Sequence, residues 1–179
     1  MTSTWNAPIR ILDHGTELAI TYDDCIRYHG RTSIGGVALG FRLLQLALAD
    51  LSPGRVPERA EISLRTAFPG PGLRDAIEMV TRAVSRRAYV VDEALAPLDA
   101  PDAPEAVAGR LWFEITIAGA RQTYAVVDGA MSEEFVRIGR ASKHPGFDAA
   151  SAARWLELRE GLAATIMAGA PEAVLRRPA

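Results

Sequence analysis

The segment "RLWFEITIAGARQTYAVVD" (110–128) decides the fold class that this sequence predicts. Its first half alternates polar side chains with Phe113, Ile115 and Ile117, the pattern of a strand that has one buried face. Gly119-Ala120 predicts a two-residue turn with glycine first, so that an antiparallel strand follows. Strands and helices elsewhere show no regular alternation, and we therefore expect an α+β domain rather than a doubly wound parallel sheet.

Outward from this hairpin, the sequence predicts further short strands and several helices. Apolar alternation or composition predicts strands over 9–12, 17–21, 59–68 and 88–91. Apolar spacing predicts helices over 37–51, 73–87 and about 148–168, and a short helix over 25–29 with Asp23 or Asp24 as its cap. The segment 132–140 predicts one more extended or short helical piece, and 94–109, rich in Ala, Pro and acidic residues, predicts a surface connection. We expect one domain over 1–179.

The overall composition excludes several classes of protein. The formal net charge is −2, which gives no electrostatic reason to expect nucleic acid or an acidic membrane as a partner. A single cysteine excludes an internal disulfide and an all-cysteine metal cage. No signal peptide is recognisable, and the longest apolar run, around 37–49, is interrupted by Arg42 and Gln45 and too short to span a bilayer. The sequence therefore predicts a soluble, cytoplasmic protein.

Two glycine-containing loops each lead into a predicted helix, the first glycine loop at 29–36 and the second at 69–72. A helix N-terminus favours an anion through its free N–H groups and its dipole. Arg31 could grip a carboxylate or phosphate with two hydrogen bonds. If 29–36 and 69–75 converge, a small anionic ligand could lie between them; otherwise the glycines only permit tight turns. The candidate ligand-binding residues are Gly30, Arg31, Thr32, Ser33, Gly35, Gly36 and Gly72.

The first glycine loop is not a nucleotide-binding phosphate loop. Gly30 and Gly35 have the spacing of the G-x-x-x-x-G-K-[ST] motif, but Gly36 and Val37 follow in place of Lys and Ser/Thr. A helix rather than a strand is expected to precede this loop. An NTPase is therefore not expected.

Three side chains are candidates for acid–base or nucleophilic chemistry: His29, Asp75 and Cys25. Cys25 and His29 stand four residues apart, so on a helix they share one face. They could be two metal ligands, a thiolate–imidazole pair, or simple neighbours. His29 lies where a helix meets the first glycine loop. Asp75 lies just inside the helix that follows the second, where it could also serve as a first-turn charge.

Two short motifs resemble the FmdE-like proteins, a family named for a component of formylmethanofuran dehydrogenase. The family motif H-G-H-x-C-P-G, followed by a helix close to L-A-L-G-Y-R, is similar to "HGRTSIGGVALGFR" (29–42). A second family motif, C-G-x-D-A-I, is similar to "GLRDAIEMVT" (72–81). The resemblance covers about 20–128. It implies an α+β domain with a mixed β-sheet, helices packed on one side, and a homodimer.

The chain departs from this family at the residues that matter most. Arg31 and Ser33 stand at the second His and the Cys of the first motif, and Gly72 stands at the Cys of the second. Family members resemble metal binders through these positions, and many carry a C-terminal zinc ribbon that is absent here. We therefore expect a metal-free pocket in which Arg31 holds an anionic ligand and His29 or Asp75 moves a proton. The alternatives are a metal-dependent protein of C1 or redox metabolism with His29 and Cys25 as ligands, and a non-catalytic accessory module.

Overall fold

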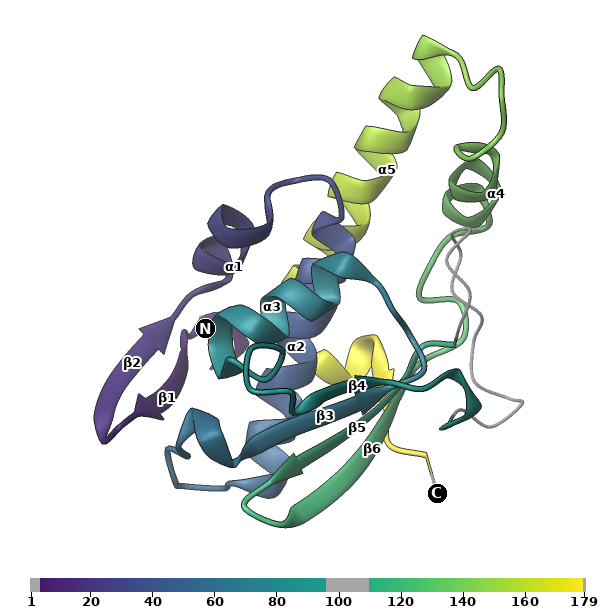
Figure 1. The fold of residues 1–179 in the computed structure, drawn as a ribbon. Helices are drawn as coiled ribbons and strands as arrows, with labels where there is room; N and C mark the ends of the chain where they lie inside the picture. The colour runs from purple at the N-terminus through teal and green to yellow at the C-terminus, as the bar shows by residue number, and fades with distance from the viewer. Residues whose placement is uncertain (1–3, 96–109, 179) are drawn as a thin grey trace.

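The computed structural model describes residues 4–95 and 110–178 and confirms the α+β fold (Figure 1). The helices are α1 (Tyr22–His29), α2 (Ile34–Leu51), α3 (Pro71–Thr81), α4 (Glu133–Ala141) and α5 (Ala149–Ala168). The strands are β1 (Ile9–Asp13), β2 (Thr16–Ile20), β3 (Ile62–Thr66), β4 (Tyr89–Val91), β5 (Trp112–Ile117), β6 (Ala120–Val126) and β7 (Leu175–Arg176). Of the expected connection 94–109, all from residue 96 onward lies outside the described residues.

The strands form a separate β1–β2 hairpin and a five-stranded mixed sheet in the order β4-β3-β5-β6-β7. β3 and β4 are parallel, while β3–β5, β5–β6 and β6–β7 are antiparallel. Phe113, Ile115 and Ile117 are fully buried, as the alternation in β5 predicted. Their face of the sheet is covered by α2, which contacts both β5 and β6.

The β5–β6 turn lies one residue earlier than predicted. Ala118 and Gly119 are its two central residues, both with positive φ (50° and 86°), and β6 already begins at Ala120. Two successive positive φ angles are the geometry that suits the twist of a two-residue hairpin. Glycine therefore stands second in the turn, and Ala118 adopts the left-handed conformation at some cost.

The core of the protein is α2, which is packed between α3, α5 and the sheet. It begins at Ile34, earlier than the predicted 37, so Gly35 and Gly36 belong to its first turn and not to a loop. Among the described residues, α2 is the one helix long and apolar enough to cross a membrane, but it is mostly buried, as a core helix would be. Its all-round apolar surface is thus used within the chain and is not available for a dimer contact.

Arg42 is a fully buried cation within α2. Its guanidinium donates to the carbonyls of Trp5, Ile166 and Met167, and to Oε1 of Gln45 at 2.7 Å. Ile166 and Met167 lie in the last turn of α5, and the carbonyls of that turn accept no hydrogen bond from within the helix. Arg42 therefore fixes the C-terminal end of α5 to the core.

Two helix boundaries differ from their predictions, one because of a polar cap and the other because of a left-handed residue. α1 is capped by Thr21, not by Asp23 or Asp24. The Thr21 hydroxyl accepts from the Asp24 amide at 3.1 Å, and the Asp24 carboxylate accepts from the Thr21 amide at 2.9 Å, a capping box. α3 ends at Thr81 instead of continuing to 87, since Arg82 adopts a left-handed conformation.

The segment 132–140 is helical in the structure and forms most of α4. α4 and the N-terminal part of α5 extend away from the sheet (Figure 1). They are joined by a small apolar cluster of Phe135, Ile138 and Trp155, in which the rings of Phe135 and Trp155 lie 4.7 Å apart. β7, a two-residue strand beside β6, was not predicted.

Candidate functional site

The two glycine loops meet in the structure. A Cβ added to Gly72 would lie 2.3 Å from the backbone oxygen of Ser33, and one added to Gly36 would lie 3.2 Å from the amide nitrogen of Leu73. Only glycine permits this approach of backbone to backbone. The N-termini of α2 and α3 are therefore side by side, so the segments 29–36 and 69–75 converge.

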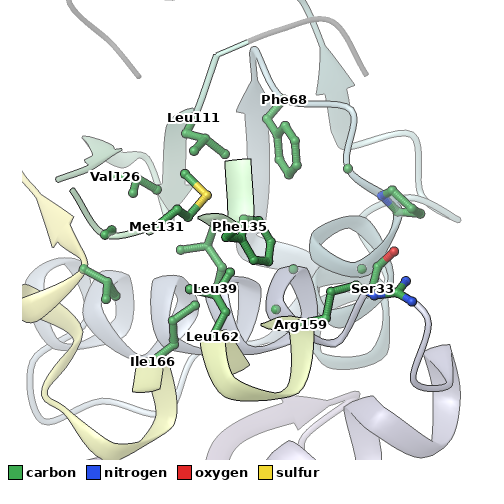
Figure 2. A pocket seen from close by; sticks show the side chains of 17 residues that line it. Ser33, Leu39, Phe68, Leu111, Val126, Met131, Phe135, Arg159, Leu162 and Ile166 are labelled. Atoms are coloured by element: carbon green, nitrogen blue, oxygen red, sulfur yellow. The ribbon is translucent and has the colours of Figure 1, made fainter. Parts of the chain in front are cut away.

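A cavity of about 90 Å³ opens beside this contact (Figure 2). One end is formed by the starts of the two helices, with Ser33, Gly35, Gly36, Gly70, Pro71 and Gly72 in its wall. The rest of the wall is apolar and comes from the sheet, α4, α5 and the segments beside them, including Leu111, Val126, Met131, Phe135, Leu162 and Ile166. An apolar cavity with a few polar groups at one end is the usual form of a small-molecule site.

Among the residues that the structure describes, Arg159 of α5 is the one charged residue in the wall of this cavity. Its guanidinium donates to the carbonyl oxygen of Thr32 and lies 5.3 Å from the centre of the Trp155 ring. Its Nε atom is buried and has no hydrogen-bond partner within the described parts of the chain. Figure 2 shows Arg159 next to Ser33 on one side of the cavity, while Leu111, Val126 and Met131 lie on the other.

Arg31, which the sequence predicts as the cation that binds the ligand, already forms an ion pair within the chain. Its Nε and Nη2 atoms donate to the two carboxylate oxygens of Glu160 at 2.9 and 2.7 Å. Its side chain is 63% exposed and does not line the cavity. Arg31 thus joins the first glycine loop to α5, and the cation in the cavity wall is Arg159.

The other predicted ligand-binding residues divide into two groups. Ser33, Gly35, Gly36 and Gly72 line the cavity. Gly30 and Thr32 do not: Gly30 ends α1 with a φ of 86°, and Thr32 contributes the carbonyl that accepts from Arg159.

His29 and Asp75 are brought together from separate motifs. His29 Nδ1 lies 2.8 Å from Asp75 Oδ2, and the two side chains are 7% and 24% exposed. An ionised carboxylate is only an acceptor, so Nδ1 donates this hydrogen bond. Nε2 is buried and finds no partner among the described residues. Neither residue lines the cavity, so this pair is a separate feature on the α1 side of α3.

Cys25 is fully buried and behaves as a core residue. Burial, with a smaller contribution from the charge of Asp24, raises the pKa of its thiol to about 12. A thiol with this pKa is protonated at neutral pH, and it is the thiolate that attacks substrates and binds metals. The interpretation of Cys25 and His29 as simple neighbours is therefore favoured over a nucleophilic pair or two metal ligands.

The donors present do not fit the metal site that the family resemblance would imply. Within 4–95 and 110–178, no group of three or more His, Cys, Asp and Glu side chains could hold an ion. His29 and Asp75 are two donors, whereas zinc sites need three or four. Ser33 and Gly72, which stand at the family's cysteine positions, line the apolar cavity instead.

The sequence patterns did not identify Arg159 as a residue of the site. Trp155, Leu158, Leu162 and Ile166 form the apolar stripe that predicts the last helix. Arg159 lies four residues after Trp155, and therefore on the same face of the helix. A cation on the apolar face of a core helix was the signal that could have identified it.

No family model matches this chain, and no curated protein matches it. The resemblance to the FmdE-like proteins therefore stays a prediction from two short motifs.

Proposed function

We propose that this protein binds a small anionic organic molecule in the cavity between α2, α3 and α5, with Arg159 as its counter-ion. The observation that carries this proposal is the position of Arg159, the one charged residue in the described wall of a cavity that is otherwise almost entirely apolar; its buried Nε has no partner within the described chain. A buried donor without an acceptor costs about 1–3 kcal/mol. A ligand carboxylate or phosphate would supply that acceptor.

The two helix starts add to the attraction for an anion. The first amides of α2 and α3 have no acceptor inside their own helices, and the positive ends of both helix dipoles are next to the cavity. Ser33, at the N-cap of α2, makes no capping hydrogen bond with its side chain. Its hydroxyl is therefore available to a ligand beside Arg159.

The contact between Arg31 and Glu160 supports the site without touching a ligand. Together with the hydrogen bond from Arg159 to Thr32, it holds the first glycine loop against α5. Because Ser33 directly follows this loop segment, the two contacts fix the polar end of the cavity. Arg31 is thus a positioning residue in this proposal.

Proton transfer by His29 or Asp75 is a second, weaker candidate function. It is favoured by the 2.8 Å contact and by the buried Nε2 of His29, which no described residue engages, the arrangement in which a carboxylate orients an imidazole base. The pair does not reach the cavity, so ligand binding is the function that the geometry supports best.

Three further expectations stay proposals: membership of the FmdE-like family, a cytoplasmic location and a homodimer. The dimer would have to use a surface other than α2, since α2 is enclosed by its own chain. Light scattering of the purified protein tests this point directly.

The proposed function is tested by a thermal-shift screen of small anions, because a ligand of the native state raises the melting temperature. The panel contains alkyl and aromatic carboxylates and inorganic phosphate, on wild type and Arg159→Gln. Arg154→Gln is the matched control, since Arg154 lies on the same helix but pairs with Glu134 and Glu157 outside the cavity. We expect a stabilising anion whose effect is lost in Arg159→Gln and kept in Arg154→Gln. Equal shifts in all three proteins would contradict the proposal.

A further inference from the structure

We infer that the ligand is a short aliphatic monocarboxylate, with its carboxylate between Arg159 and Ser33 and its alkyl tail toward Leu111, Val126 and Met131. This inference rests on the proposed function and specifies the ligand class of the same site. It follows from the number of charges, the distribution of polar groups and the size of the cavity.

The charge balance at the polar end favours a single negative charge. Arg159 is the one cation in the described wall of the cavity. The neighbouring Arg31 is neutralised by Glu160, which follows Arg159 in the sequence. A dianion such as a phosphate monoester would leave one charge without a partner, and burying an unpaired charge is costly. A carboxylate matches one planar guanidinium.

The polar groups are confined to one end. Apart from Arg159 and Ser33, the described side chains in the wall are aliphatic, aromatic or thioether groups, and the remaining residues are glycine, alanine and proline. A hydroxyl or amide on the far part of a ligand would find no hydrogen-bond partner there, and burying an unpaired polar group weakens binding. The tail is therefore expected to be a hydrocarbon.

The volume limits the length of that tail. The cavity encloses about 90 Å³, whereas a cavity of about 150 Å³ is the size known to admit benzene. A volume of about 90 Å³ corresponds to roughly three water molecules of the liquid, or on the order of three or four methylene groups. Butanoate and pentanoate, with three and four tail carbons, fit this space, and long-chain fatty acids do not.

A substitution at Ala130 can test the length of the ligand tail independently of the charge at Arg159. It lies in the segment between β6 and α4, lines the cavity next to Met131, and is half-buried. A larger side chain there would occupy the apolar end and leave Arg159 untouched. Ala130→Leu should therefore shorten the preferred ligand without changing the preference for a carboxylate.

The experiment is isothermal titration calorimetry of the full chain with butanoate, pentanoate, hexanoate, octanoate and decanoate, and with the matching alcohols. In wild type we expect affinity to rise about fourfold for each methylene up to about pentanoate and then to level off. We expect each alcohol to bind at least about tenfold more weakly than its acid, the loss of one charge-assisted hydrogen bond. Arg159→Gln should abolish this preference, Arg154→Gln should keep it, and Ala130→Leu should move the plateau to a shorter acid.

Two results would overturn the inference: equal binding of acids and alcohols by wild type, or an affinity gain that continues undiminished to decanoate. If benzoate or inorganic phosphate binds in an Arg159-dependent way while the alkyl acids do not, the inference fails and the proposed function stands. If no anion binds in an Arg159-dependent way, both fail. Ala130→Val replaces Ala130→Leu if the latter does not fold, as judged by its circular dichroism spectrum.

Discussion

His29 Nδ1 donates to Asp75 Oδ2 across 2.8 Å, although the two residues lie 46 positions apart in the sequence. The contact joins the last residue of α1 to the first half of α3, and both residues belong to the motifs that resemble the FmdE-like family. It does so without contributing to the cavity wall.

We expect Asp75→Ala to lower the free energy of unfolding by about 2 kcal/mol, because a buried ring N–H loses its charged acceptor. The measurement is urea denaturation, with Asp128→Ala as a control for an exposed aspartate, which should stay within about 0.5 kcal/mol of wild type. In a double-mutant cycle, His29→Ala should cost much less in the Asp75→Ala background. Strictly additive effects would show that the contact contributes no energy.

Alkaline pH should destabilise the fold through Cys25. Burial raises the pKa of this thiol from an ordinary value of 9.0 to about 12. The folded state therefore holds the proton more tightly, so this contribution is complete below about pH 9 and is lost as the pH rises toward 12. Between pH 9 and 10 this thiol should lower the free energy of unfolding by about 1 kcal/mol, because the unfolded thiol ionises and the folded one does not.

Cys25→Ala identifies the group responsible. It should reduce this pH dependence between pH 9 and 10 and leave the part that comes from buried tyrosines, whatever its effect on stability at pH 7. Tyr22, Tyr89 and Tyr124, whose pKa values burial raises, would then dominate the loss above pH 10. A slope that is unchanged in Cys25→Ala would assign the effect elsewhere.

Arg31→Ala should leave the choice between acids and alcohols intact. The Arg31 guanidinium is occupied by Glu160 and exposed, so its loss weakens a salt-sensitive surface contact. We expect less than about a threefold change in ligand affinity, against a complete loss of the acid preference in Arg159→Gln. Calorimetry at low and high salt makes the comparison. A loss of acid preference in Arg31→Ala would show that the ligand pairs with Arg31, as predicted from the sequence, and not with Arg159.

Two glycine-to-alanine substitutions should have opposite signs. Gly72→Ala places a Cβ 2.3 Å from the Ser33 carbonyl oxygen, so the starts of α2 and α3 must separate, at a cost of about 1–3 kcal/mol. Gly161→Ala, inside α5, meets nothing within 4 Å and should stabilise by about 0.5–1 kcal/mol through helix propensity. Thermal unfolding of both variants is the test, and a neutral Gly72→Ala would show that the backbone contact is looser than described.

The sequence was sufficient where a local pattern repeats along one element. The alternation of Phe113, Ile115 and Ile117 predicted β5, and apolar spacing predicted most of α2 and α5. The sequence was not sufficient where a contact with a distant segment determines an element's bounds. α2 starts at Ile34 because α3 packs against Gly36, a residue that helix propensity disfavours. β7 exists because β6 offers it an edge.

The meeting of the two glycine loops could be predicted from the sequence, but the charged residue of the cavity could not. Glycine spacing indicated two loops that deliver helix starts, and these loops do meet. Which arginine faces the cavity depends on the position of α5, which no local pattern encodes. Glu160 forms an ion pair with Arg31, whereas the adjacent Arg159 has no carboxylate partner among the described residues and lines the cavity.

The small apolar cluster of Phe135, Ile138 and Trp155 has a kinetic consequence. It lies outside the main core, so α4 and the start of α5 can open with less free energy than global unfolding requires. Phe135 belongs both to this cluster and to the cavity wall. Amide hydrogens of α4 should therefore exchange faster than those of α2, and the part of the cavity wall that Phe135 forms should be less rigid than the part formed by α2.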